Sequence, residues 1–307
     1  MMTQAPEHVL GVHVSTAGGL PTAVGRAQRL GCRAFQLFTA NPRQWALQPV
    51  APDTAEAFRR AVQESGITTV VSHAGYLLNL ASPRPELVQK SLAALRAECE
   101  RCRQLGIPLL VLHPGSCPAD QRFEGLRRVA EALRTVLQSS DATLTLCLEL
   151  TAGQGNAIGS SLEELAILRE SSSCPERLGV CVDTCHALAA GYRLDTEEGY
   201  SAFWTRFEEL FGREALRVLH LNDSAYPAAS GRDRHAHIGL GHCGIGCFAR
   251  LLGDPRWRPI PMILETPKGK DDRADRLNLT VLRYLAAGEE LTADMLHVLW
   301  SQYHGSV

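Results

Sequence analysis

The stretch Gly179-Val-Cys-Val-Asp-Thr-Cys-His186 joins a short apolar run to two groups that can bind metal. Gly179 to Val182 are uncharged and small or β-branched, which is typical of a short buried strand. Asp183 stands where this strand ends, and His186 follows three residues later on the turn that leaves it. A carboxylate and an imidazole this close together can face one cavity and bind a metal ion. The alternative is that Asp183 caps the next helix and His186 is a hydrogen-bonded structural residue.

Similar apolar runs recur along the whole chain, each followed by a longer amphipathic stretch. The eight runs are Val9–Val14, Ala34–Phe38, Thr68–Ser72, Leu109–Leu112, Thr143–Leu148, Gly179–Val182, Leu216–Leu221 and Pro261–Leu264. Near-continuous apolar strands joined by helices predict an α/β protein with a parallel sheet, and eight units predict a single closed (β/α)8 TIM barrel. A doubly wound open sheet is the alternative, but the chain lacks an obvious nucleotide fingerprint. We expect the barrel over residues 1–290 and a C-terminal helical tail over residues 291–307.

Composition limits the classes of partner and compartment. The net charge of −2 and the pI of about 6.6 give no overall basic footprint, so nucleic-acid binding would need a local basic patch or bound cations. No apolar run reaches transmembrane length, and the N-terminal residues lack a secretion signal. The ten cysteines are scattered among strands and helices, which favours reduced core residues in a cytoplasmic protein with no membrane contact.

Histidine and acidic residues recur at the carboxyl ends of the third to eighth strands. These residues, with three more on the following turns and loops, are His73, His113, Glu149, Asp183, His186, His220, Asp233, His235 and Glu265. In a barrel, this rim is where active sites are built. Five imidazoles and four carboxylates would repel one another or lose solvation unless cations fill the space. Nine ligands exceed the needs of one ion, so the count predicts two or three metals, and nitrogen and oxygen ligands without thiolates favour Zn²⁺ or Mn²⁺.

These motifs occur together in one known family. The main correspondences are Gly179–His186, His113-Pro-Gly-Ser116, Thr151-Ala-Gly-Gln-Gly155 and His220-Leu-Asn-Asp223 followed by Asp233-Arg-His235. They closely resemble the motifs of the endonuclease IV family, the class II apurinic/apyrimidinic (AP) endonucleases of DNA base excision repair. The match extends in the family's order from Gly11-Val-His-Val-Ser15 through Leu264-Glu265.

The resemblance implies three Zn²⁺ ions, with Mn²⁺ as an alternative at one or more sites. It places the first ion between His73, His113 and Glu149, the second between Glu149, Asp183, His220 and Glu265, and the third between His186, Asp233 and His235. The implied activity is hydrolysis of the phosphodiester 5′ to an abasic site, which leaves a 3′-hydroxyl and a 5′-deoxyribose phosphate. Glu149 would bridge two ions and Glu265 would orient the attacking water, which makes both residues catalytic.

The resemblance also implies that the partner is double-stranded DNA containing abasic sites. Arg43 would enter the duplex at the lesion and Tyr76 would stack in the gap. Phosphate contacts are expected from Arg232, Arg234, Lys268 and Lys270. The chain departs from the family pattern at Ala74-Gly75, Leu150, Ala225 and Ala229, and these differences bear on DNA contacts rather than on metal ligands.

Two other functions fit part of the pattern. A sugar isomerase or epimerase on the same barrel also uses His, Asp and Glu around one or two metals, but it does not need a third site at Asp233-Arg-His235. A non-catalytic DNA-damage-binding protein is expected to have lost at least one ligand, whereas all nine are present here. We therefore expect a monomeric, metal-dependent AP endonuclease.

Overall fold

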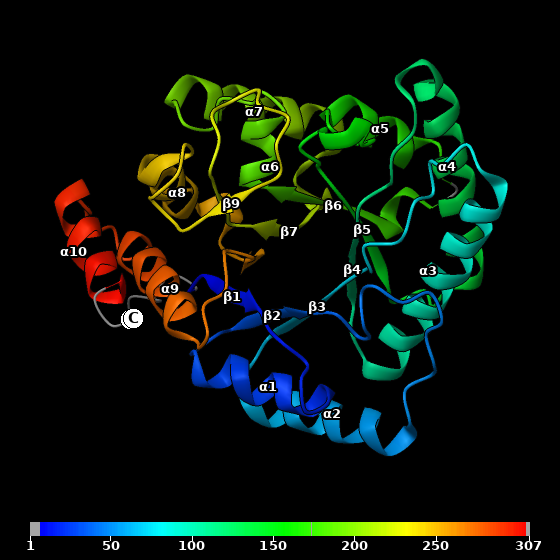
Figure 1. Ribbon diagram of the computed structural model, residues 1–307, viewed down its shortest axis with the longest axis horizontal. Helices are drawn as coiled ribbons and strands as arrows, with labels where there is room; N and C mark the ends of the chain where they lie inside the picture. Colours follow the sequence, from blue (N-terminus) through cyan, green and yellow to red (C-terminus); the bar gives the residue numbers. More distant parts are fainter. Residues whose placement is uncertain (1–6, 173, 305–307) are drawn as a thin grey trace, which may run out of the picture.

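Eight parallel strands close into a barrel in the computed structural model, which describes residues 7–172 and 174–304 (Figure 1). The strands are β1 (Val9–His13), β2 (Ala34–Leu37), β3 (Thr69–His73), β4 (Leu109–Leu112), β5 (Thr145–Glu149), β6 (Leu178–Asp183), β7 (Leu216–His220) and β10 (Pro261–Leu264). Neighbours in the sequence are neighbours in the barrel, and β10 closes the ring by pairing with β1 from Val9↔Pro261 to Val12↔Leu264. The predicted TIM barrel is confirmed, with strand ends displaced by up to two residues.

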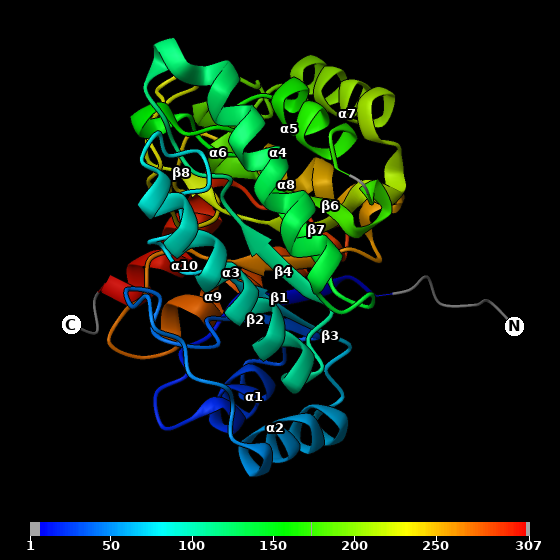
Figure 2. The same cartoon turned by 90° about the vertical axis from the view of Figure 1, so that its right-hand side faces the viewer.

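Helices cover the outside of the barrel (Figures 1 and 2). They are α1 (Leu20–Arg29), α2 (Pro52–Ser65), α3 (Pro85–Leu105), α4 (Arg122–Ser139), α5 (Leu162–Glu170), α6 (Thr184–Ala189), α7 (Glu197–Phe211), α8 (Gly244–Gly253), α9 (Arg273–Ala286) and α10 (Ala293–His304). Each longer helix buries one apolar stripe, as expected for helices that lie on a sheet. None of the helices within the described residues is both long and apolar enough to cross a lipid bilayer.

Apolar side chains fill the interior of the barrel below its rim. A separate buried cluster inside the ring consists of Ala34, Val71, Leu109, Val111, Cys147, Cys181, Val218 and Ile263. At Gly11 a Cβ atom would lie 1.9 Å from the carbonyl oxygen of Ala34, so β1 and β2 approach closely only because this residue is glycine. The packed interior leaves the carboxyl rim as the place for polar chemistry.

The segment that follows β6 differs from the sequence-based expectation. His186 lies within the short helix α6 rather than on a turn. A second unpredicted feature is the antiparallel ribbon of β8 (Asp223–Ser224) and β9 (His235–Ala236), which encloses the loop after β7. The backbone of Ala229 in this loop has a φ of 59°, in the left-handed region that glycine favours. The ribbon therefore holds the loop that carries Asp233 close to the rim.

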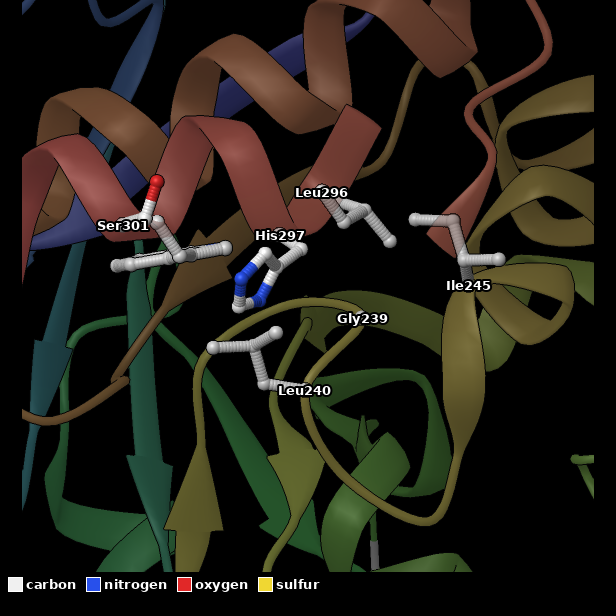
Figure 3. Close-up of a pocket in the computed structure, with 7 residues that line it drawn as sticks. Gly239, Leu240, Ile245, Leu296, His297 and Ser301 are labelled. Carbon is white, nitrogen blue, oxygen red and sulfur yellow. The ribbon is translucent and has the colours of Figure 1, made fainter. Parts of the chain in front are cut away.

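Helix α10 packs against the barrel rather than standing free. Leu296 and Trp300 are buried, and the Trp300 ring stacks on His237 with 4.3 Å between the ring centroids. A pocket of about 590 Å³ lies between α10 and the segment from Gly239 to Ile245 (Figure 3). The expected tail is thus helical over Ala293–His304, while residues 305–307 lie outside the described residues. Its separation from a barrel domain at residue 290 stays a prediction.

Candidate metal centre

All nine candidate ligands lie together at the carboxyl rim of the barrel. His73, Glu149, Asp183 and His220 are the last residues of β3, β5, β6 and β7. The others lie just beyond strand ends or on α6, β9 and the intervening loop; they are His113, Glu265, His186, His235 and Asp233. Parallel strands bring their carboxyl ends to one side of the barrel, which is why residues distant in sequence meet here.

Glu149 is the centre of this cluster. Its carboxylate is fully buried, and each of its oxygens faces two imidazoles. Oε2 lies 3.1 Å from His73 Nε2 and 2.9 Å from His113 Nε2. Oε1 lies 3.0 Å from His220 Nδ1 and 3.3 Å from His186 Nδ1. One carboxylate therefore connects side chains from four other elements.

The pKa values around Glu149 show that the cavity attracts positive charge. Burial alone would raise the pKa of Glu149, but the charges of His113 and His220 and hydrogen bonds from His113 and His186 hold it well below its usual range. Burial would likewise lower the pKa of His220, but Glu265 and Glu149 raise it to about 9. The same balance raises the pKa of His186 well above its usual value. Protons or metal cations can supply this positive charge, and they compete for the same nitrogen atoms.

A second group of carboxylates surrounds His220. Its Nδ1 atom lies 3.0 Å from Glu149 Oε1, 3.2 Å from Glu265 Oε2 and 3.9 Å from Asp183 Oδ2. Burial would raise the pKa of Glu265, but the charge of His220 and the close contact with His13 hold it well below the usual value. Three carboxylates directed at one ring nitrogen favour positive charge at this position, which a proton or a metal ion can supply.

Asp183 combines two roles that the sequence presents as alternatives. Its Oδ1 atom accepts a hydrogen bond of 2.9 Å from the backbone N–H of His186 and caps α6. Its Oδ2 atom faces the cluster and accepts a hydrogen bond of 2.6 Å from Asn222 Nδ2. The helix cap therefore fixes the direction of the carboxylate instead of removing it from the site.

The imidazoles of His186 and His235 are oriented as metal ligands usually are. Nδ1 of His186 donates to the carbonyl of Leu150 at 3.0 Å, and Nδ1 of His235 donates to the carbonyl of Glu265 at 3.1 Å. In a neutral imidazole the Nε2 atom then carries a lone pair. Among the described residues, neither buried Nε2 atom has a hydrogen-bond partner. The Nε2 atoms of His186 and His235 lie 3.2 Å and 3.4 Å from Asp233 Oδ1, without hydrogen-bonding geometry. A cation bound between these two nitrogens and this oxygen would satisfy all three atoms.

Three groups with atoms close enough to share an ion follow from these contacts. Within each group the candidate atoms lie within 4.8 Å of one another; the groups are His73–His113–Glu149, Glu149–Asp183–His220–Glu265 and Asp183–His186–His235. The first two groups match the sets expected from the sequence, while the third contains Asp183 beside the two histidines. Asp233 faces the same two histidines; burial would raise its pKa, but the close contact with His186 and the charges of His186 and His235 lower it to about 2.

Cys181 also lies within this distance of Glu149 and His220. Burial, together with the nearby Glu149 carboxylate, raises the pKa of its thiol well above the usual value. A neutral thiol is a poor metal ligand, so Cys181 belongs to the barrel core. All ten cysteines are free thiols, as expected from the sequence.

Residues that the sequence analysis missed hold these ligands in place. Gln36 is buried in β2 and bonds to both Glu265 and His220. Asn222 donates to Asp183 and accepts from the backbone N–H of Glu265 at 2.8 Å. Gln154 accepts from the backbone N–H of Asp233 at 2.9 Å. In the sequence, these residues appear only as uncharged polar residues inside or after an apolar strand. Such a residue can support a metal ligand, but it can equally be an ordinary buried amide with hydrogen-bond partners.

The two residues expected at the DNA lesion lie on adjoining loops. The Tyr76 side chain is 65% exposed, and its ring contacts Phe38 edge-on with centroids 5.1 Å apart. Its backbone N–H donates to the carbonyl of Pro42 at 3.0 Å, which ties this loop to the one that carries the exposed Arg43. Both side chains are therefore accessible to a large ligand at the barrel mouth.

The expected phosphate-binding cations are exposed, but three of them already have protein partners. Arg232 lies over the Tyr226 ring, 4.6 Å from its centroid, and Arg234 donates to the carbonyl of Asp233 at 2.5 Å. Lys268 Nζ bonds to Asp275 Oδ1 at 2.6 Å. Such contacts orient a cation and do not neutralise it completely, so all of them remain able to meet a phosphate.

A buried polar network on α3 anchors the Arg43 loop. Thr39 Oγ1 donates to Glu98 Oε2 at 2.6 Å and accepts from Arg101 Nε at 3.0 Å. The guanidinium of Arg101 also donates to the carbonyls of Thr39 and Gln48, at the two ends of the loop. Arg101 is 8% exposed, so these carbonyls have little access to water that could replace it.

Comparison with known proteins assigns the chain to a family. The family described as Xylose isomerase-like TIM barrel matches residues 24–286, so the chain belongs to this class of barrels. A relative from Chloroflexus aurantiacus named "Probable endonuclease 4" is 46% identical over 281 residues, covering 91% of this chain and 99% of the relative. A relative of the same name from Halorhodospira halophila is 46% identical over 283 residues, covering 92% and 95%. The chain belongs to the endonuclease IV family.

A solved structure agrees with this assignment. Endonuclease IV from Thermus thermophilus superposes with a TM-score of 0.82 at 37% sequence identity. The similarity covers 92% of this chain and all of the Thermus chain. The resemblance expected from the motifs is therefore confirmed at the level of the family.

Replacing Arg101 with methionine should release the Arg43 loop. The variant leaves buried acceptors at Thr39 and Gln48 without their donor, and we expect a loss of about 3–5 kcal/mol in the free energy of unfolding. Tryptic cleavage after Arg43 should become faster, as followed by mass spectrometry of timed digests. The control is Arg103→Met on the same helix, because Arg103 is exposed and pairs with Glu100 at the surface. Equal unfolding and digestion in the two variants would show that the network does not hold the loop.

Proposed function

We propose that this chain is a metal-dependent AP endonuclease of base excision repair. It hydrolyses the phosphodiester 5′ to an abasic site in double-stranded DNA and leaves a 3′-hydroxyl and a 5′-deoxyribose phosphate. The observation that carries the proposal is the convergence of four imidazoles on the buried carboxylate of Glu149, at the rim of a barrel of the endonuclease IV family.

The ligand groups have the donor atoms that zinc and manganese accept. One ion would be held by His73, His113 and Glu149, and a second by Glu149, Asp183, His220 and Glu265. A third would be held by His186, Asp233 and His235, with Asp183 close to the same nitrogens. When bound, such ions acidify water and offset the negative charge that develops on phosphate oxygens. The proposed content is three Zn²⁺, with Mn²⁺ as an alternative.

The protein residues set the geometry of this reaction. Glu149 keeps its two oxygens directed at two different groups of ligands, so it would fix the separation of the first and second sites. Glu265 presents Oε2 to the cluster while Oε1 is held by Gln36, so it is placed to accept a hydrogen bond from the attacking water. The backbone carbonyls behind His186 and His235 hold both rings with their Nε2 atoms toward the cavity.

Binding of DNA would depend on local groups because the whole chain has a net charge of −2. Most of the candidate ligands are buried below the loops, so the abasic nucleotide would have to leave the duplex to reach them. Arg43 and Tyr76 would fill the gap that it leaves, and Arg232, Arg234, Lys268 and Lys270 would contact phosphates. The chain would act as a monomer in the cytoplasm.

The rival functions explain less of the site. A sugar isomerase needs one or two metals and gives no role to the Asp233 and His235 pair on the ribbon loop. A non-catalytic damage-binding protein has no need to retain nine converging ligands. The relatives that match at 46% identity carry the name of a nuclease, which supports the enzyme over either rival.

Removal of metal should abolish cleavage of an abasic duplex. Protein prepared without chelator should contain close to three metal ions per chain by elemental analysis, since three ligand groups are present. It should cut a labelled duplex with one abasic site on its 5′ side, while an intact duplex stays uncut. Prolonged chelation should stop cleavage, and Zn²⁺ or Mn²⁺ should restore it. A content near one ion together with no cleavage would favour a sugar-isomerase-like site.

Replacing Glu149 with glutamine should stop the chemistry and leave DNA binding largely intact. The change removes the negative charge shared by four imidazoles, and we expect cleavage to fall by about 100- to 1,000-fold, the range for loss of a strong electrostatic contact in a transition state. The measurements are single-turnover cleavage, affinity for the abasic duplex and metal content. Glu163→Gln on the exposed face of α5 is the matched control. Near-normal turnover with all metals retained would exclude the bridging role.

Variants at Tyr76 and Arg43 should lose recognition of the lesion without losing metal. Base stacking on an aromatic residue is worth about 1–3 kcal/mol, so Tyr76→Ala should weaken the preference for an abasic over an intact duplex by about 10- to 100-fold. Arg43→Ala should have an effect of similar size. Affinities for duplexes with and without a tetrahydrofuran abasic analogue are compared at one salt concentration. Tyr284→Ala, on the exposed side of α9, is the control. An unchanged preference in both variants would place recognition elsewhere, with residues 224–234 as the next segment to test.

A further inference from the structure

The second strand contributes to the metal centre through an uncharged residue. Strand β2 has the sequence Ala-Phe-Gln-Leu and so carries no His, Asp or Glu. Gln36 is nevertheless completely buried at the rim, beside His13 of the neighbouring strand β1. Its side chain reaches Glu265 and His220, which belong to the second ligand group.

Every polar atom of the Gln36 amide has a partner. Nε2 donates to Glu265 Oε1 at 2.6 Å and to His13 Nδ1 at 2.9 Å, and Oε1 accepts from His220 Nε2 at 2.9 Å. The reversed amide would place its oxygen against the Glu265 carboxylate, where two acceptors would face each other. The network therefore permits one orientation of this amide.

This orientation determines the proton position on His220. Because Gln36 Oε1 can only accept, the Nε2 atom of His220 must carry a hydrogen. In the neutral ring the lone pair is then on Nδ1, which faces Glu149, Asp183 and Glu265. A ligand nitrogen is usually prepared in this way by a hydrogen bond to the opposite side of its ring.

The same amide also orients Glu265. Its bond to Oε1 holds that oxygen on the side of His13, and Oε2 remains directed at His220 Nδ1, 3.2 Å away. His13 accepts the second amide hydrogen through Nδ1, at a distance of 2.9 Å. Both oxygens of Glu265 therefore have fixed directions.

We propose that Gln36 is a positioning residue for the second metal site, where it fixes the tautomer of His220 and the orientation of Glu265 together. The inference rests on the proposed function, since it assigns Gln36 a task in that same metal centre. An apolar residue of similar size could fill the space, but His220 Nε2 would lose its buried acceptor, and Glu265 Oε1 would lose its 2.6 Å bond and keep the weaker 3.3 Å contact with His13 Nδ1.

The test compares Gln36→Met with Phe35→Leu. Methionine keeps the length of glutamine and removes all three of its hydrogen bonds. Phe35 is the preceding residue of β2 and is buried against Phe58 of α2, away from the ligands, so its variant controls for loss of packing in the same strand. Metal-free protein is titrated with Co²⁺, and the visible absorption spectrum and the affinity of each bound ion are recorded. Steady-state cleavage of an abasic duplex by the zinc-loaded proteins is measured in parallel.

In Gln36→Met we expect the affinity for one Co²⁺ ion to fall by about 10- to 100-fold with an altered absorption band, the range for loss of a partner behind a metal ligand. The other ions should keep their affinities. The value of kcat should fall by a similar factor while KM changes little, because the DNA-contacting loops are untouched. Phe35→Leu should keep the wild-type spectrum and affinities.

The outcomes separate this inference from the proposed function. If wild-type protein cleaves the abasic duplex and Gln36→Met binds Co²⁺ with the wild-type spectrum and affinities, Gln36 is a packing residue and the inference is wrong. If wild-type protein neither binds several ions nor cleaves, the proposed function itself fails. Should Gln36→Met not fold, Gln36→Asn keeps the amide but is one methylene too short for both partners, and the same loss is expected in it.

Discussion

The buried negative charge of Glu149 is the constraint on which the rest of the rim depends. A carboxylate with no exposure to solvent is stable only if positive charge and hydrogen-bond donors surround it. Imidazoles from β3, β7, α6 and the residue after β4 supply them within 3.3 Å. The histidines in turn face three further carboxylates, so bound cations would stabilise the cluster as a whole. The positions of these strand ends are thus tied to one another through a single side chain.

Backbone and amide groups give this charge cluster its definite geometry. Asp183 is directed by capping α6, and His186 and His235 are turned by carbonyl oxygens of Leu150 and Glu265. Gln36 and Asn222 do the same for the second ligand group through neutral amides. Neutral groups suit this task because they orient ligands without altering the charge that attracts the metal. The ribbon of β8 and β9 adds the remaining ligands from a loop that a bare barrel lacks.

The surroundings of the centre suit a polyanionic substrate despite the slight negative charge of the whole chain. Exposed Arg and Lys side chains lie on the loops around the candidate metal ligands, where metal ions would add further positive charge. The local electrostatic potential at the barrel opening can therefore be positive although the net charge of the chain is negative. The loop that carries Arg43 is held by Thr39, Glu98 and Arg101 and by its contact with the Tyr76 loop. If this loop contacts DNA as proposed, its prior order lowers the entropy lost on binding.

The sequence by itself determined the barrel and the membership of its rim. Apolar runs of strand length repeat eight times, and ligand residues stand at their ends, so one-dimensional spacing was enough to predict which residues share a face. Only the tertiary structure decided how they meet: that Glu149 contacts four histidines, that Asp183 is both cap and cluster member, and that Gln36 joins His220 to Glu265. These contacts depend on the directions of side chains across a closed barrel, between residues up to 229 positions apart. The local sequence around each residue does not determine such directions.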